Sequence, residues 1–157
     1  MAQKTNAARL LDQAGVAYDL KEYPVDESDL SATTVAGKVG LNFNQVYKTL
    51  VTRGDKTGVM LACIPADKEL NLKALAQLSG NKKVEVVPLK EVQPLTGYIR
   101  GGVSPVGCKK KYPVFIEAEY SSQEKLSISA GIRGCQIIID PVDLQKATQA
   151  QAGAISV

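Results

Sequence analysis

Two β-rich runs on either side of a short turn constrain the fold of this chain more than any other feature. The segment 45–65, "QVYKTLVTRGDKTGVMLACIP", is rich in β-branched and aliphatic residues and is interrupted by "GDKTG". Such a pattern is typical of two strands joined by a tight turn. The segment therefore predicts a hairpin, and a sheet that contains it must be antiparallel or mixed.

The remaining elements interleave irregularly around this hairpin. The hydrophobic patterns and the stop signals predict helices at 6–15, 33–40, 71–80 and 142–153, with a broken helical turn at 89–97. They predict further strands at 16–23, 82–88, 113–120, 125–131 and 135–141. We expect an α+β fold in which a mixed, strongly curved, barrel-like sheet is surrounded by helices.

The composition limits the chemistry that this chain can perform. It contains no histidine, which excludes Ser-His-Asp and Cys-His catalysis and every histidine-based metal centre. Its three cysteines are widely spaced and form no CxxC, so they indicate a reducing cytosol instead of a disulfide framework or a zinc site. We expect no metal and no cofactor. An enzyme of this composition must use lysine, a carboxylate, main-chain N–H groups or a group of its own substrate.

Length and charge narrow the class of protein further. A chain of 157 residues fits one domain, 1–157, with a real core. The net charge of +3 permits an anionic partner but is too small to argue for strong autonomous binding of nucleic acid. No apolar run approaches the roughly 20 residues that a membrane span needs, and the first residues do not resemble a secretory signal. We expect a cytoplasmic protein without membrane contact.

Lys48 lies in an unusual phase of the first hairpin strand. Because side chains alternate along a strand, Val46, Lys48 and Leu50 share one face. The commoner interpretation is a lysine that protects a sheet edge and extends its ammonium group to water. The alternative is a lysine held at the floor of a pocket, where its three donors suit a phosphate or a polarised carbonyl oxygen.

A glycine-rich loop, "GYIRGGVSPVG", is the second candidate site. Gly101 and Gly102 can present consecutive N–H groups to an anion or a developing oxyanion, although such dipeptides also make plain tight connections. Pro105 and the spacing exclude the dinucleotide-binding and Walker A loops. Lys109–Lys111 follow, as a solvated turn or as a strip for a nucleic-acid backbone.

Taken together, "VYKTL", "TGYIRGGVSPVGCKKK" and "SAGIRG" resemble the YbaK/EbsC family of aminoacyl-tRNA deacylases in their order and spacing, from the first helix to Asp140. The resemblance implies the fold of the editing domain inserted in bacterial prolyl-tRNA synthetase. It also implies a trans-editing hydrolase that removes a wrong amino acid, cysteine in the YbaK branch, from tRNA(Pro). Prolyl-tRNA synthetase is the protein partner that the resemblance suggests.

The resemblance also assigns residues. Lys48 falls on the family's essential lysine, and Gly101 with Pro105 falls on its GxxxP loop, which makes Lys48 and Gly101 the expected catalytic groups. The residues expected to bind substrate are Tyr23, Leu30, Thr49, Gly102, Ser129 and Ala130. Those expected to bind tRNA are Lys109, Lys110, Lys111 and Arg133.

Three positions depart from the family pattern near the amino-acid pocket. Ala130 stands where a glycine is expected, Gln136 where the YbaK branch tends to have an aspartate, and Leu30 where an aromatic residue is expected. These departures bear on which amino acid is removed. A deacylase for Ala- or Ser-charged tRNA therefore remains an alternative to the Cys-tRNA(Pro) deacylase.

The resemblance implies a mechanism that needs no histidine. N–H groups of the glycine loop would face the ester carbonyl oxygen, and Lys48 would act from the opposite wall. The cysteinyl thiol of the substrate would attack its own carbonyl and leave as a thiolactone. A non-catalytic module that binds RNA or a synthetase is the third hypothesis. Lys48 together with the loop argues against it, because simple binding needs no lysine in an apolar strand phase.

Overall fold

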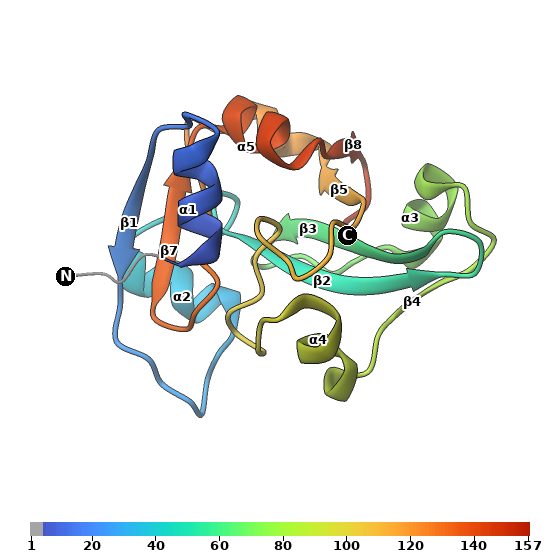
Figure 1. The fold of residues 1–157 in the computed structure, drawn as a ribbon, viewed down its shortest axis with the longest axis horizontal. Coiled ribbons are helices and arrows are strands. Elements are labelled where there is room, and N and C mark those ends of the chain that lie inside the picture. The colour runs from blue at the N-terminus through green and yellow to red at the C-terminus, as the bar shows by residue number, and fades with distance from the viewer. Residues whose placement is uncertain (1–4) are drawn as a thin grey trace.

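The computed structural model, which describes residues 5–157, contains two open sheets flanked by short helices (Figure 1). The smaller sheet is antiparallel and has the order β1-β7-β6, with bounds Tyr18–Glu22, Cys135–Ile139 and Leu126–Ser129. The larger sheet has the order β4-β2-β3-β5-β8, with bounds Val84–Val86, Tyr47–Gly54, Gly58–Pro65, Val114–Glu117 and Gln151–Gly153. Its β5 and β8 pair in parallel, so the sheet is mixed.

The expected α+β class and mixed sheet are confirmed, but the strongly curved, barrel-like sheet is wrong. Among the described strands neither sheet closes on itself. The two sheets are linked by an isolated bridge between Val46 and Ser127. The smaller sheet ends at β1, which pairs with β7 over five residues. No described strand pairs with the outer edge of β1, so the two sheets do not close into a barrel.

Within residues 5–157 there are five α-helices of eight residues each, and four of them begin at a residue whose side chain accepts a hydrogen bond from the first turn. These N-caps include Asn71, at the start of the helix expected at 71–80, and Asp140, just before the one expected at 142–153. The α-helices are α1 (Asn6–Gln13), α2 (Ala32–Val39), α3 (Leu72–Ser79), α4 (Leu89–Thr96) and α5 (Pro141–Thr148), and a 3₁₀ helix, η1, covers Ala118–Ser122. Among the described residues, every helix is too short or too polar to cross a membrane.

The predicted hairpin is confirmed, and Asn81 holds its turn. The strands β2 and β3 pair from Tyr47 opposite Pro65 to Gly54 opposite Gly58. Asn81 Oδ1 accepts hydrogen bonds from the main-chain N–H groups of Lys56 and Thr57, at 2.8 and 3.0 Å. The Asn81 amide lies where a Cβ of Gly54 would be, so a larger residue at Gly54 would displace the side chain that holds the turn.

The hairpin separates two parts of the core. On one face Val51, Leu61 and Cys63 pack with Ile128 and Ile137 of the smaller sheet. On the other face Met60, Ala62 and Ile64 pack with Leu75 of α3. These buried contacts fix the hairpin on both faces.

The C-terminal segment is held by the buried carboxylate of Glu117. The expected last helix ends early, at Thr148, where Gln149 adopts a left-handed conformation with φ 55°, and β8 follows. Glu117 Oε1 accepts hydrogen bonds from Ile155 N, Ser156 N and Ser156 Oγ at 3.0, 2.9 and 2.7 Å. Its side chain therefore ties the last residues to the end of β5.

Glu117→Ala should lower the free energy of unfolding by about 2–4 kcal/mol, because it leaves three donors without their shared acceptor. Urea denaturation of the variant and the parent protein measures the difference. Glu119→Ala is the control, since this exposed neighbour should change stability by less than about 0.5 kcal/mol. Equal, small losses in both variants would show that the carboxylate does not hold the C-terminal segment.

Candidate active site

A cavity of about 700 Å³ opens beside β2, between the N-terminal end of α2 and α4. Figure 1 shows α2 and α4 on the same side of β2. Five of the residues expected from the sequence line this cavity, namely Leu30, Lys48, Thr49, Gly101 and Ser129. Gln136, at the position of a family departure, lines it too. Segments far apart in the chain thus meet in one place.

Lys48 is half-buried on the cavity wall. Its Nζ donates a hydrogen bond to the main-chain oxygen of Ala66, at 3.2 Å. Burial lowers the pKa of Lys48, and the charges of Glu69 and Asp67 oppose this effect. One donor holds the ammonium group in place, and the others remain for an anion or a carbonyl oxygen. The residue lies at an open sheet edge, as one interpretation expected, but it faces a cavity, as the other did.

Gly101 and Gly102 have different roles, which corrects the expectation of two consecutive free N–H groups. Gly101 lines the cavity in a left-handed conformation with φ 84°, and no hydrogen bond among residues 5–157 uses its N–H. The N–H of Gly102 donates to Ile99 O at 2.9 Å. A Cβ on Gly102 would lie 3.1 Å from the carbonyl carbon of Ile132. Gly102 therefore permits close main-chain packing, outside the cavity lining.

Arg133 holds the glycine loop from behind. Its Nε donates to Arg100 O at 2.8 Å, and its guanidinium group lies 4.0 Å from the Glu27 carboxylate. Its side chain also lies against Gly101, 3.4 Å from where a Cβ would be. Arg133, expected to bind tRNA, is thus engaged with this loop, whereas the exposed Arg100 lines the cavity. Arg100 was missed, although its position just before Gly101 was a signal.

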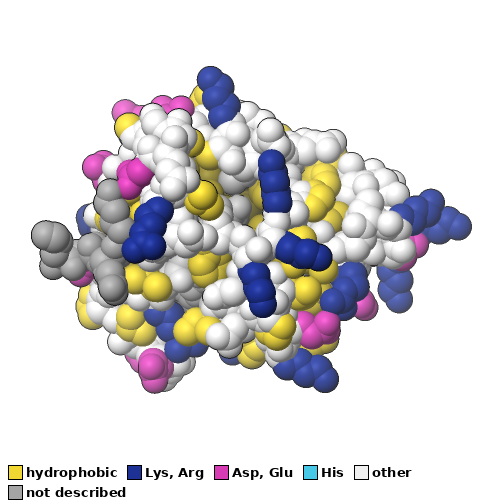
Figure 2. Space-filling view, in the orientation of Figure 1, with side chains coloured by type: hydrophobic (Ala, Val, Ile, Leu, Met, Phe, Trp, Pro, Cys, Tyr) yellow, Lys and Arg dark blue, Asp and Glu magenta, His cyan; other side chains and the backbone are white. Residues whose placement is uncertain are grey.

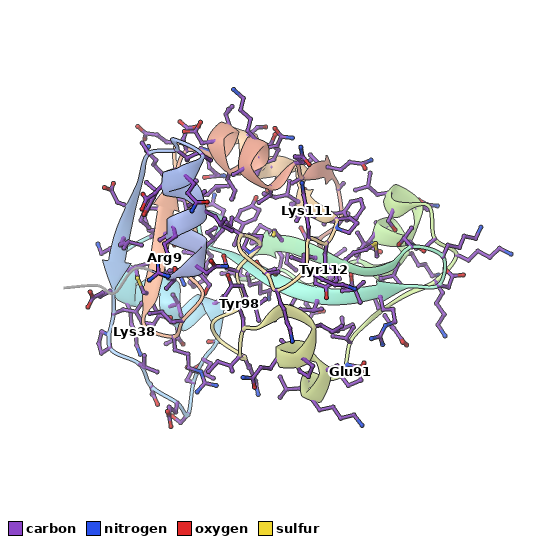
Figure 3. The ribbon with its side chains drawn as sticks, in the orientation of Figure 1. Arg9, Lys38, Glu91, Tyr98, Lys111 and Tyr112 are labelled. Carbon is purple, nitrogen blue, oxygen red and sulfur yellow. The ribbon has the colours of Figure 1, made fainter. Side chains whose placement is uncertain are left out.

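Two tyrosines hold the loop, one by a bond within it and the other by a bond to α4 (Figure 3). Tyr98 Oη donates to Val106 O at 2.6 Å, within the loop. Tyr112 Oη donates to Leu95 O at 2.7 Å, near the end of α4. Glu91 of α4 is in turn bonded to Arg53 of β2 at 2.8 Å. These contacts set the position of the cavity wall that α4 provides.

The polar wall near β6 and β7 is made by Ser129 and Gln136. The Ser129 hydroxyl accepts a hydrogen bond from Gly131 N at 3.1 Å, and Gln136 Oε1 accepts one from the Ser127 hydroxyl at 2.8 Å. Ala130 is fully buried in the core and does not line the cavity. Its effect on a substrate would be indirect.

Tyr23 and the lysine triplet also lie outside the cavity lining. Tyr23 packs against the small cluster formed with Val35 and Val39 of α2. Lys109–Lys111 are exposed, and Lys111 Nζ donates to Gln149 Oε1 at 3.2 Å, toward the end of α5 (Figure 3). Figure 2 shows lysine and arginine side chains distributed over this face of the molecule.

Asp29 places a negative charge at the cavity, which the sequence analysis did not anticipate. Its carboxylate accepts hydrogen bonds from the Thr34 and Ser31 hydroxyls and from Ser31 N. These bonds, that of Thr34 first, lower the pKa of Asp29. The Asp-x-Ser spacing just before α2 was the available signal.

The cysteines are not placed as nucleophiles. Burial raises the pKa of Cys63 to about 12 and that of Cys108 to about 11, and it raises the pKa of Cys135 as well. The adjoining lysines thus do not activate Cys108. None of the three thiols lines the cavity in the described structure. Nor do the described residues contain a cluster of metal-ligating side chains.

Comparison with known proteins identifies the family. The family model of the aminoacyl-tRNA editing domain matches residues 27–147. The chain belongs to this family. The editing domain is also 45% identical, over 98% of this chain and 94% of the relative, to EbsC of Enterococcus faecalis, which is named as a candidate Cys-tRNA(Pro)/Cys-tRNA(Cys) deacylase.

Two further comparisons connect the editing domain to prolyl-tRNA synthetase. The proline–tRNA ligase of Thermodesulfovibrio yellowstonii is 30% identical over 73% of this chain, which spans 19% of that protein. A crystal structure described as a candidate trans-editing enzyme for prolyl tRNA synthetase superposes with a TM-score of 0.86. It is 26% identical, and the match covers 99% of each chain.

Gly102→Ala should lower the free energy of unfolding by about 1–3 kcal/mol, because main-chain atoms of Ile132 would have to shift to admit the new methyl group. Thermal and urea denaturation measure this loss. Gly37→Ala is a matched control in α2, where nothing lies within 4 Å, and it should stabilise slightly. A neutral Gly102→Ala would refute the packing role and return this residue to the substrate-binding set.

Proposed function

We propose that this protein is a cytoplasmic trans-editing deacylase that removes cysteine from mischarged tRNA(Pro). The observation that carries the proposal is the convergence of the Lys48 ammonium group and the unused Gly101 N–H on one cavity of an editing domain. The name of the E. faecalis relative supports the choice of amino acid and tRNA. The free cysteines support the reducing compartment.

Catalysis by this cavity rests on position and charge. The ester carbonyl oxygen of the substrate would lie between Gly101 N–H and Lys48 Nζ, so that both groups stabilise the negative charge that develops on it. The cysteinyl sulfur attacks the carbonyl carbon of its own ester, and the C–O bond to the ribose breaks. The thiol proton ends on the departing ribose oxygen, and cysteine leaves as a thiolactone. The protein holds the reacting atoms together and contributes no nucleophile.

The substrate-assisted route agrees with what the cavity contains. Its lining residues include neither a cysteine nor, in this chain, a histidine. Lys48 is the ammonium group among them, and Arg100 is the other cation. A reaction that depends on a thiol of the protein would need one whose pKa is lowered, whereas burial raises all three.

The polar wall favours a second candidate, the removal of serine. The Ser129 hydroxyl and the Gln136 amide lie where a neutral hydroxyl group could find partners. A polar wall with Gln136 in place of a carboxylate would discriminate weakly between a thiol and a hydroxyl. Chemistry separates the two candidates, because a hydroxyl is a much poorer internal nucleophile than a thiol.

Prolyl-tRNA synthetase is the proposed partner. A pocket that accepts proline cannot strongly exclude amino acids of similar or smaller size, since a methylene-scale difference discriminates only about 10–200-fold. An editor that acts after the synthetase restores accuracy. The match to part of a proline–tRNA ligase supports this pairing.

Lys48→Ala should reduce the kcat for deacylation of Cys-tRNA(Pro) about 100- to 1,000-fold, because it removes a preorganised charge. Its melting temperature should change little, since the half-buried side chain makes one hydrogen bond. Lys125→Ala, an exposed position, is the control. Near-normal turnover by folded Lys48→Ala protein would reject the assigned site.

The substrate thiol should matter and the protein thiols should not. A protein with Cys63, Cys108 and Cys135 all changed to serine should retain most of its activity. Parent protein should hydrolyse cysteinyl-tRNA(Pro) much faster than seryl-tRNA(Pro), measured as the rate above spontaneous hydrolysis. Equal rates on the two esters, or loss of activity in Cys108→Ser alone, would contradict the mechanism.

The lysine triplet should act on tRNA binding and not on chemistry. Changing Lys109, Lys110 and Lys111 together to alanine should raise the KM for tRNA and flatten its salt dependence, with kcat little changed. Steady-state kinetics at several salt concentrations measure both effects. An unaltered salt slope would mean that these exposed residues form a solvated turn.

A further inference from the structure

The strand β2 leaves part of its main-chain edge unpaired inside the cavity. On one side it pairs with β3 along its full length. On the other side it pairs with β4 at Thr52–Gly54, and the bridge to Ser127 begins at Val46. Between these two points Tyr47 and Thr49 line the cavity.

The directions of the main-chain groups follow from alternation along the hairpin. The main-chain oxygen of Val46 accepts a hydrogen bond from Ala66 N at 2.8 Å. The main-chain N–H and C=O groups of the even-numbered residues of β2 therefore point toward β3. On the other side, Gln45 O accepts a hydrogen bond from Ser127 N at 2.7 Å, and Val51 O accepts one from Val87 N at 3.0 Å. The main-chain groups of the odd-numbered residues therefore point away from β3. The N–H and C=O of Thr49 and the C=O of Tyr47 therefore point along the open edge. No hydrogen bond among residues 5–157 uses them.

This open edge is too short to bind a peptide strand. A peptide that adds to a sheet forms hydrogen bonds at several alternate residues. Here Val51 O is occupied by Val87, and Gln45 O by Ser127, which leaves two outward-facing residues between them. The Tyr47 C=O and the Thr49 N–H instead suit one planar group that carries a hydrogen-bond donor next to an acceptor.

The walls beside this edge also suit a flat ring. Val87 and Leu89 flank the cavity at the β4 end, and Val92 of α4 completes this apolar side. The same cavity is also lined by Lys48 and Gly101, which are proposed to act on the ester, and by the polar Ser129 and Gln136. The apolar residues offer a surface for the part of the substrate that is not the amino acid.

We propose that this edge binds the adenine of the 3′-terminal nucleotide of tRNA. In this subsite the Tyr47 carbonyl accepts a hydrogen bond from the exocyclic amine of adenine, and the Thr49 N–H donates to the adjacent ring nitrogen. At its Watson–Crick edge adenine presents an amine donor next to a ring-nitrogen acceptor. Hypoxanthine presents the reverse, a carbonyl acceptor next to a ring N–H donor. The inference rests on the proposed function, because it assigns the base that bears the ester.

The test uses acceptor-stem minihelices that carry the same cysteinyl ester and differ in their terminal base. Parent protein should hydrolyse the adenine substrate fastest. A substrate that ends in purine, which lacks the amine, should have a kcat/KM about threefold to tenfold below that of the adenine substrate. A substrate that ends in hypoxanthine should have one about tenfold or more below it. Equal kcat/KM values on all three bases would overturn the subsite while leaving the proposed function intact. Failure to hydrolyse any of the three would reject the proposed function itself.

Two variants at Thr49 separate the main chain from the side chain. Thr49→Pro removes the N–H, and proline is tolerated at a strand position whose N–H faces away from the neighbouring strand. It should lower kcat/KM on the adenine substrate about tenfold and bring the rates on the three bases close together. Thr49→Val retains the N–H and should retain the ranking of the bases. If Thr49→Val protein loses that ranking, the Thr49 hydroxyl and not the main chain recognises the base. If Thr49→Pro protein does not fold, the rates of the parent protein on the three substrates still test the subsite.

Discussion

The antiparallel pairing of β2 with β3 is the constraint on which the rest of the structure depends. It fixes which main-chain groups of β2 are used by β3 and which face the other edge. The smaller sheet meets that edge at Val46 and β4 meets it at Thr52. The cavity lies in the interval between them, so its position is a consequence of two strand pairings that stop short of each other. Lys48 is in the middle of this interval.

The cavity has few groups that can transfer protons, and this limits the reactions that it can catalyse. Its cations are Lys48 and Arg100, and its charged carboxylate is Asp29. Gly101, whose loop is held from behind by Arg133, adds a main-chain N–H that no described hydrogen bond uses. Under the proposed function, such a site accelerates a reaction by placing charges where charge develops. The proposed mechanism takes its nucleophile from the substrate, and this dependence would make the chemistry itself selective for a thiol.

Glycines in the loop serve two separate purposes that look identical in sequence. Gly101 adopts a left-handed conformation and lines the cavity, and Gly102 allows the chain to approach the main chain of Ile132. Their places in the sequence do not separate them, since the two glycines are consecutive. Their different neighbours do, and Ile132 is thirty residues further along the chain. The expected pair of consecutive donors is for this reason reduced to one.

The sequence by itself determined the hairpin and the approximate starts of the helices after Asn71 and Asp140, because these depend on local patterns. It also determined the family motifs around Lys48 and the absence of histidine chemistry, which follow from short motifs and from composition. Only the tertiary structure decided that the strands form two open sheets, since β7 could pair with any distant strand until β1 was placed beside it. The same holds for the cavity. Its lining comes from segments that are distant in the chain, and the residues that reach it are selected by packing, which has no signature in local sequence.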